Sequence, residues 1–202
     1  MENWYTNICV QGRQPTYVID ALDELGRRAY VTPHTGGWII LYDQECEKFD
    51  LDLLQSLALT FQRGYRASHS PASTLTMSFF GWGVYEDGQL ATRYSSERKH
   101  FADAGEFPPI QDVRGVLCRI FEKPEKRQQV QKILRRPHGV LGLLSVFSRI
   151  RPAYLIEVLR PGDLAEALGL PWASVGLGYE YVNRGETPPD MERETLRRTL
   201  SG

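Results

Sequence analysis

Acidic side chains are concentrated in one short stretch of this 202-residue sequence. Asp43, Glu45, Glu47, Asp50 and Asp52 fall within ten residues, and carboxylate oxygens are the ligands that hard cations prefer. The spacing does not match an EF-hand loop, and no glycine supplies its central turn. We interpret the cluster as a solvated loop whose charge stabilises the start of the next helix, with cation binding as the alternative.

Basic side chains gather in the middle of the chain. Residues 114–160 contain 11 Lys and Arg against 3 Asp and Glu, whereas the segments before and after are net acidic, and the whole chain has a net charge of −1. This pattern indicates either packing against the acidic part of the same chain or contact with an anionic partner. The candidate residues for such a partner lie in one predicted helix: Lys126, Arg127, Lys132, Arg135 and Arg136.

The sequence contains none of the short motifs that mark common enzyme sites. No paired-histidine metal motif, GxSxG, Walker loop or complete GxGxxG is found. The run Ser95–His100 holds a nucleophile, an acid and a base, but catalytic groups usually meet in space rather than along a chain. The three cysteines, Cys9, Cys46 and Cys118, form no CxxC motif. We interpret them as small residues of the core whose thiols stay reduced, as in a reducing compartment. We therefore name no catalytic, cofactor-binding or metal-binding residue and expect no cofactor.

Aromatic residues offer a different kind of candidate. The sequence has 4 Trp and 10 Tyr, and such side chains are enriched at the hot spots of protein interfaces. Trp82 and Tyr85 lie in a β-prone run near a predicted sheet edge, and we name them as candidate interface aromatics.

The N-terminal half alternates β-prone runs with stripes of helical period. The order strand, helix, strand, strand, helix, strand is that of the ferredoxin-like split β-α-β fold, here with an added hairpin. It predicts an antiparallel sheet with two helices on one face. The predicted helices begin at Pro15 and after Asp50. The predicted strands are Thr6–Gln11, Ala29–Thr32, Trp38–Tyr42, Leu75–Phe80 (resuming at Val84-Tyr85 after an interruption at Gly81-Trp82-Gly83) and Leu90–Tyr94. The predicted core is Ile8, Val10, Val18, Leu22, Ile39, Leu41, Leu54, Leu57 and Leu75.

The C-terminal half reads as all-helical. Pro124 and Pro171 are placed to start helices, and Asp163 with Glu166 three residues later has the spacing of a capping box. Trp172, Val175, Tyr179 and Val182 predict one apolar stripe on a single last helix. The predicted elements are helices from Asp112, over Glu125–Arg136, His138–Ile150 and Leu164–Leu168, a short helix or turn over Pro152–Leu159, and the last helix from Pro171 to Gly185. We expect an α+β domain over residues 1–100, a linker over 101–111, a helical domain over 112–186 and a charged tail over 187–202.

The segment 163–183 resembles the helix-turn-helix of bacterial DNA-binding regulators. Ala165, Gly169 and Val175 occupy the positions of the small residue, the turn glycine and the β-branched residue of that motif. The resemblance implies that the second helix reads DNA bases. It departs from the pattern because Gly178 replaces an apolar residue and no Lys or Arg lies between Trp172 and Asn183. A packed helical hairpin, with Leu177 and Tyr181 at least half buried, is the interpretation we favour.

These observations lead to an expected function without a catalytic site. The chain is expected to be a non-enzymatic cytoplasmic module of bacterial type whose partner is another protein. The first alternative is a nucleic-acid-binding regulator that uses helices 114–136 and the hairpin 163–183. The second is an enzyme whose site forms between the two domains. We expect no signal peptide, because Met1–Tyr5 contains an acidic residue and no basic one. We expect no membrane span, because the longest apolar run, Val140–Phe147, is too short.

Overall fold

The fold of the chain is seen in a computed structural model, which combines helices with one antiparallel sheet. The structure describes residues 5–48, 51–62, 70–75, 80–86, 89–95, 108–135, 153–189 and 191–199. The strands are β1 (Tyr5–Gln11), β2 (Ala29–Val31), β3 (Trp38–Asp43), β4 (Ser70–Leu75), β5 (Phe80–Glu86), β6 (Gln89–Ser95) and β7 (Arg197–Arg198). The α-helices are α1 (Pro15–Glu24), α2 (Leu51–Gln62), α3 (Ile110–Ile120), α4 (Arg127–Leu134), α6 (Ala153–Leu168), α7 (Trp172–Val175) and α8 (Tyr179–Asn183).

The sheet has the order β6-β5-β4-β1-β3-β2-β7, and each pair of neighbours is antiparallel. β1 is central: Ile8 pairs with Leu41 of β3 on one side and with Ala72 of β4 on the other. The predicted β2–β3 hairpin is present, and Gly36 and Gly37 both adopt the positive φ that its turn requires. The mixed helix and antiparallel-sheet class expected from the sequence is confirmed.

One face of the sheet is covered by α1 and α2. Ile8, Val10, Ile39 and Leu41 point to this face because they alternate along β1 and β3. The predicted core residues Val18, Leu22, Leu54 and Leu57 join them in one apolar cluster, whereas the side chain of Leu75 lies outside the described residues.

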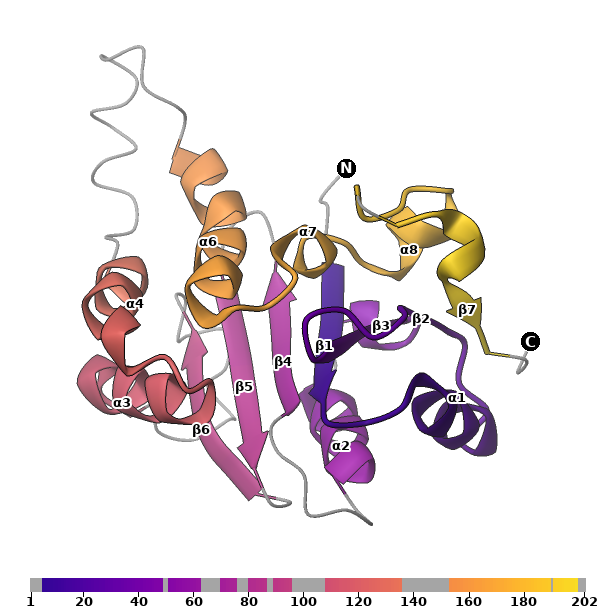
Figure 1. Cartoon of the computed structure of the whole chain (residues 1–202), viewed down its shortest axis with the longest axis horizontal. Coiled ribbons are helices and arrows are strands. Elements are labelled where there is room, and N and C mark those ends of the chain that lie inside the picture. Colours follow the sequence, from indigo (N-terminus) through magenta and orange to yellow (C-terminus); the bar gives the residue numbers. More distant parts are fainter. Residues whose placement is uncertain are drawn as a thin grey trace.

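The opposite face is covered by the C-terminal helices. Cys9, Ile40 and Tyr42 point to this side and share a second apolar cluster with residues of α3, α4, α6, α7 and α8. Figure 1 views the sheet from the side on which α6 and α7 lie. β3 therefore has both faces buried, which agrees with its apolar sequence. The division into domains stays a prediction, but the described C-terminal helices and the sheet share this core.

The structure corrects the predicted strand Leu75–Phe80. β4 ends at Leu75 and β5 begins at Phe80, and these two residues pair with each other across the strands. Gly81 and Gly83 lie inside β5 rather than interrupting the sheet. A Cβ at Gly83 would lie 3.4 Å from the ring of Tyr85, which is an ordinary van der Waals contact.

The region around Asp163 is also corrected. α6 runs continuously from Ala153 to Leu168, so Asp163 lies inside the helix and does not cap it. Pro161 interrupts its hydrogen-bond ladder at a cost of about 3 kcal/mol. Burial of Leu164, Ala165 and Leu168 against the sheet offsets that cost. Gly169, at φ +76°, ends the helix as predicted.

The last helix is two helices rather than one. α7 ends at Val175 and α8 begins at Tyr179, with Gly176, Leu177 and Gly178 between them. Two glycines cost about 1 kcal/mol each in a helix interior, which explains the break. The predicted helix His138–Ile150 lies outside the described residues, as do most of the linker and the end of the tail.

Candidate functional site

The basic residues predicted to meet an anionic partner lie largely on one exposed surface. Val130, Ile133 and Leu134 turn the inner side of α4 into the core, and therefore Arg127, Lys132 and Arg135 are exposed. Lys126, at the end of a 3-10 turn (Pro124–Lys126), is half-buried, and Arg136 lies outside the described residues. Within the described part of the chain, none of the four placed cations forms an ion pair.

The neighbouring arginines of α3 are already used within the fold. Arg119 donates two hydrogen bonds to the carboxylate of Glu86 on β5, at 2.9 and 2.7 Å. Arg114 donates to the side chain of Gln131 and ties α3 to α4. The surface available to an anion is therefore the outer side of α4, hereafter the α4 basic face (Lys126, Arg127, Lys132 and Arg135).

Trp82 and Tyr85 do not lie on a surface in this structure. Each is only 7% exposed, and they belong to the two different cores on opposite faces of the sheet. Trp82 stacks on Tyr94 of the neighbouring strand at a ring separation of 5.8 Å. This burial corrects the prediction that they offer aromatic surface to a partner, because β5 is covered on both faces.

The acidic cluster is divided among separate structural contacts. Asp43 is buried, forms a two-pronged ion pair with Arg27 and accepts a hydrogen bond from the backbone N–H of Cys46. Glu47 accepts a hydrogen bond from the backbone N–H of Glu180 in α8. Asp52 is exposed, and Asp50 lies outside the described residues. In the regions that can be described, no three His, Cys, Asp or Glu side chains are placed to hold a metal ion. Cation binding at residues 43–52 therefore gains no support.

The segment that resembles a helix-turn-helix is fastened to the sheet by polar side chains. Asn7 of β1 donates hydrogen bonds to the carbonyl oxygens of Val175 and Leu177, at 2.7 and 3.2 Å. The Tyr42 hydroxyl of β3 donates to the carbonyl oxygen of Ser174 at 2.9 Å. The Tyr30 hydroxyl of β2 donates to Asn183 at 3.1 Å. We call Asn7, Tyr30 and Tyr42 the clasp.

The clasp holds α7 and α8 in a packed position. Val175, Tyr179 and Val182 are buried as predicted, and Leu177 and Tyr181 are half-buried against the same core. The helix His138–Ile150, predicted to cover those two residues, lies outside the described part. α7 has four residues, so the segment lacks the long second helix that the resemblance implies.

Trp172 differs from its predicted place in the buried stripe. It is 59% exposed, more than Leu25, Leu90 or Tyr17, the other large apolar side chains that stand out from the described surface. The ring lies on the side of α6 that carries Gly162, where an added Cβ would come within 4.0 Å of it. Trp172 is the first residue of α7, and the stripe of one continuous helix does not extend to it.

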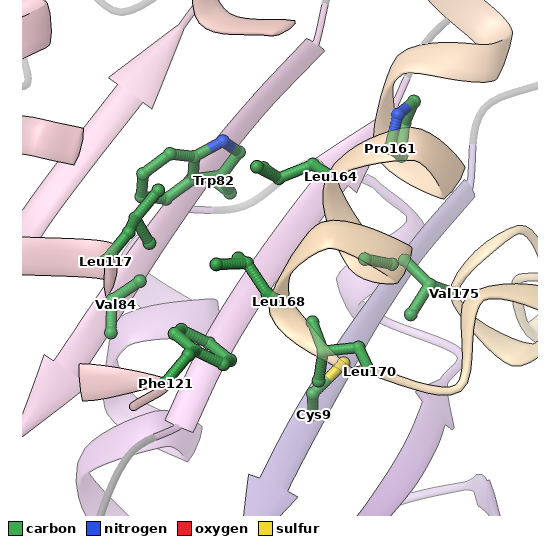
Figure 2. A pocket seen from close by; sticks show the side chains of 11 residues that line it. Cys9, Trp82, Val84, Leu117, Phe121, Pro161, Leu164, Leu168, Leu170 and Val175 are labelled. Carbon is green, nitrogen blue, oxygen red and sulfur yellow. The ribbon is translucent and has the colours of Figure 1, made fainter. Parts of the chain in front are cut away.

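A small apolar cavity lies between the sheet and α6 (Figure 2). Its volume is about 30 Å³, roughly the share of one water molecule in the liquid. Trp82, Val84 and Cys9 line it from the sheet, and Leu164 and Leu168 line it from α6. Among the described residues, the buried indole N–H of Trp82 has no hydrogen-bond acceptor. Its size and apolar lining identify a packing gap rather than a substrate pocket.

The thiol chemistry of the chain also points away from a nucleophile. Cys9, Cys46 and Cys118 are all buried and none is in a disulfide. Burial raises the pKa of the Cys9 thiol far above its ordinary value, and the thiol contacts Asn7 Oδ1 at 3.7 Å. A thiol that stays protonated is a poor nucleophile, which agrees with the prediction of core cysteines.

Comparison with known proteins adds no name to these surfaces: no family model, no curated protein and no solved structure matches the chain. Within the described residues, no helix has the length and apolar character needed to cross a membrane. The sequence identified the α4 basic face, but it missed Trp172 and the clasp. The clasp residues are separated from their partners by at least 132 positions, so no local pattern could have revealed them.

Proposed function

We propose that the protein is a non-enzymatic module that binds another protein, with Trp172 as the anchoring side chain. The observation that carries this proposal is the 59% exposure of Trp172. Tryptophan is the residue type most enriched at interface hot spots, because its large apolar ring fills a pocket and its N–H finds an acceptor. The proposed partner is a protein with an apolar pocket that receives the indole.

The way in which Trp172 is presented supports this proposal. Three hydrogen bonds from Asn7 and Tyr42 hold the carbonyl groups of Ser174, Val175 and Leu177 against the sheet. The backbone that carries the indole is therefore positioned before any partner binds. A preorganised anchor loses less conformational freedom on binding, and more of its contact energy appears as affinity.

The test compares Trp172→Ala with a matched control, Leu25→Ala. Leu25 is 49% exposed at the end of α1, which packs on the other face of the sheet. After affinity capture from nuclease-treated lysate, candidate partners are purified and titrated against the full chain. We expect Trp172→Ala to weaken binding by about 30-fold or more, equivalent to about 2 kcal/mol, and Leu25→Ala to leave it unchanged. Equal affinity for Trp172→Ala and the unchanged chain would refute the proposal.

A second candidate function is the binding of nucleic acid through the α4 basic face. The observation that favours it is the exposure of Arg127, Lys132 and Arg135 without ion-pair partners in the described chain. If each of the five candidate cations, Arg136 included, neutralises one phosphate, the slope of log K against log salt on duplex DNA is about −4.5, or −0.9 for each phosphate. Binding that survives 150 mM salt and is lost in Lys132→Gln would favour this candidate over the first.

We infer a ferredoxin-like arrangement for β1 to β4, supported by the internal order β4-β1-β3-β2 and by α1 and α2 on one face.

A cytoplasmic location is proposed because the three cysteines are buried and unpaired. An enzyme site between the sheet and the C-terminal helices would need polar groups, and the cavity described there is apolar.

A further inference from the structure

The helices α3 and α4 are connected as in a helix-turn-helix, although the sequence resemblance to that motif lies at 163–183. Three residues, Phe121–Lys123, join α3 to the 3-10 turn that leads into α4, and helix-turn-helix units use connections of three or four residues. Glu122 adopts a positive φ of 52°, and the N–H of Lys123 donates to the carbonyl oxygen of Cys118 at 2.9 Å, which ends α3 sharply. Figure 1 shows the two helices together at one side of the molecule.

α4 is held at its start, in its middle and at its end. At the start, Phe121 of the connection is buried in the core. In the middle, Arg114 of α3 donates a hydrogen bond to the side chain of Gln131. At the end, the Tyr94 hydroxyl of β6 donates to the carbonyl oxygen of Leu134 at 2.8 Å. The outer side of α4 is therefore positioned before a ligand binds, and a preorganised surface loses less conformational freedom on binding.

The outer side of α4 carries long polar side chains. Glu125, Gln128, Lys132 and Arg135 follow one another at helical spacing and are all exposed, and we call them the α4 outer stripe. The large apolar side chains that are exposed on the described surface lie on other elements. A protein interface is centred on apolar or aromatic anchors, which this stripe lacks, whereas interfaces with DNA are polar and positively charged.

The composition of the stripe also favours duplex DNA over the other nucleic acids. Proteins that bind single strands stack the bases on aromatic rings, and no residue of α4 is aromatic. Double-stranded RNA has a major groove that is too deep and narrow for side chains to read. The major groove of B-DNA admits an α-helix, and a glutamine there can bond both N6 and N7 of adenine.

We propose that α4 is a DNA-reading helix whose outer stripe enters the major groove, where Gln128 reads an adenine while Lys132 and Arg135 bind phosphates. The N-terminal residues of a recognition helix contact the base edges, and Gln128 is the second residue of α4. Glu125, one turn earlier, accepts from N4 of cytosine. This inference rests on the second candidate function, to which it adds the form of nucleic acid, the groove and the reading residue. It does not involve Trp172.

The test selects binding sites for the full chain from duplex DNA with a randomised centre, at 150 mM salt. We expect one sequence that contains an adenine to be enriched. Gln128→Ala should remove the preference for that adenine and weaken binding to the selected duplex about tenfold, with little change on a duplex of scrambled sequence. Lys132→Gln should weaken binding to both duplexes by a similar factor and make the salt slope shallower by about 0.9.

The matched control is Gln55→Ala, at an exposed position of α2 on the opposite face of the sheet, which should change neither affinity. A second measurement uses the unchanged chain and does not depend on the folding of any variant. Dimethyl sulfate methylates guanine N7 in the major groove and adenine N3 in the minor groove. We expect protection of N7 in the selected duplex, and protection of N3 alone would overturn the proposal.

Three other outcomes would also contradict a reading helix. Equal binding to every duplex, with the expected salt slope, would overturn the reading role and leave the second candidate function standing. Absence of binding to any duplex at low salt would overturn both. Equal or tighter binding to a single strand or to duplex RNA of the same sequence would show that the ligand is not the major groove of DNA.

Discussion

The cavity beside α6 gives a quantitative prediction about packing. Val84 lines this cavity from β5 and is 1% exposed, so Val84→Ile would add one methylene to a gap of about 30 Å³. Cavities destabilise proteins by about 24 cal/mol per Å³, which gives about 0.7 kcal/mol here. Burial of one methylene contributes a similar amount, about 0.8 kcal/mol. Because these two figures describe the same effect, we expect a gain of about 0.5–1 kcal/mol.

The assay is urea unfolding at equilibrium, followed by circular dichroism and tryptophan fluorescence. The matched control is Val31→Ile in the opposite core, where Val31 is fully buried on β2 and does not line the cavity. We expect the control to lose about 1 kcal/mol or more through overpacking. A loss of more than 1 kcal/mol in Val84→Ile, or the same result for both variants, would show that the cavity is not where the structure places it.

Two further predictions concern the buried core. Leu57 of α2 is 2% exposed and packs against the sheet. We expect Leu57→Ala to lower the free energy of unfolding by about 2–5 kcal/mol. A decrease below about 0.5 kcal/mol in urea unfolding would contradict the predicted core face. Because burial raises its pKa, Cys9 should react with a thiol reagent at pH 8 only as fast as the chain opens. Peptide mapping after brief exposure checks this, and rapid modification of Cys9 in the folded chain would be incompatible with its position.

The elements that the sequence predicted best are those with a strong apolar period. Trp38–Tyr42 is a continuous β-branched and aromatic run, and Pro15 with Val18 and Leu22 marks a helix start and its inner face. The strand β4 was predicted at the wrong residues, because its sequence, SPASTL, has no apolar alternation. It is a strand because it pairs with β1 and β5. Such tertiary pairing is invisible to local patterns.

Of the candidate functional features, those set by a local apolar pattern could be predicted from the sequence, and those set by tertiary contacts could not. The α4 basic face could be predicted because Val130, Ile133 and Leu134 fix which side of the helix is buried. The clasp could not, because Asn7 and Tyr42 meet α7 only when the C-terminal helices cover the second face of the sheet. The exposure of Trp172 follows from the break between α7 and α8, which a periodic stripe cannot represent.

In the proposed function, a protein partner receives the indole of Trp172. The most direct measurement replaces Trp172 by a photo-reactive phenylalanine in cells and identifies the cross-linked protein, with the same replacement at Leu25 as control. We expect one discrete cross-linked partner from position 172 and none of it from position 25. We also expect the affinity of that purified partner to fall about 30-fold or more with Trp172→Ala. The same cross-links from both positions, or an unchanged affinity, would contradict it.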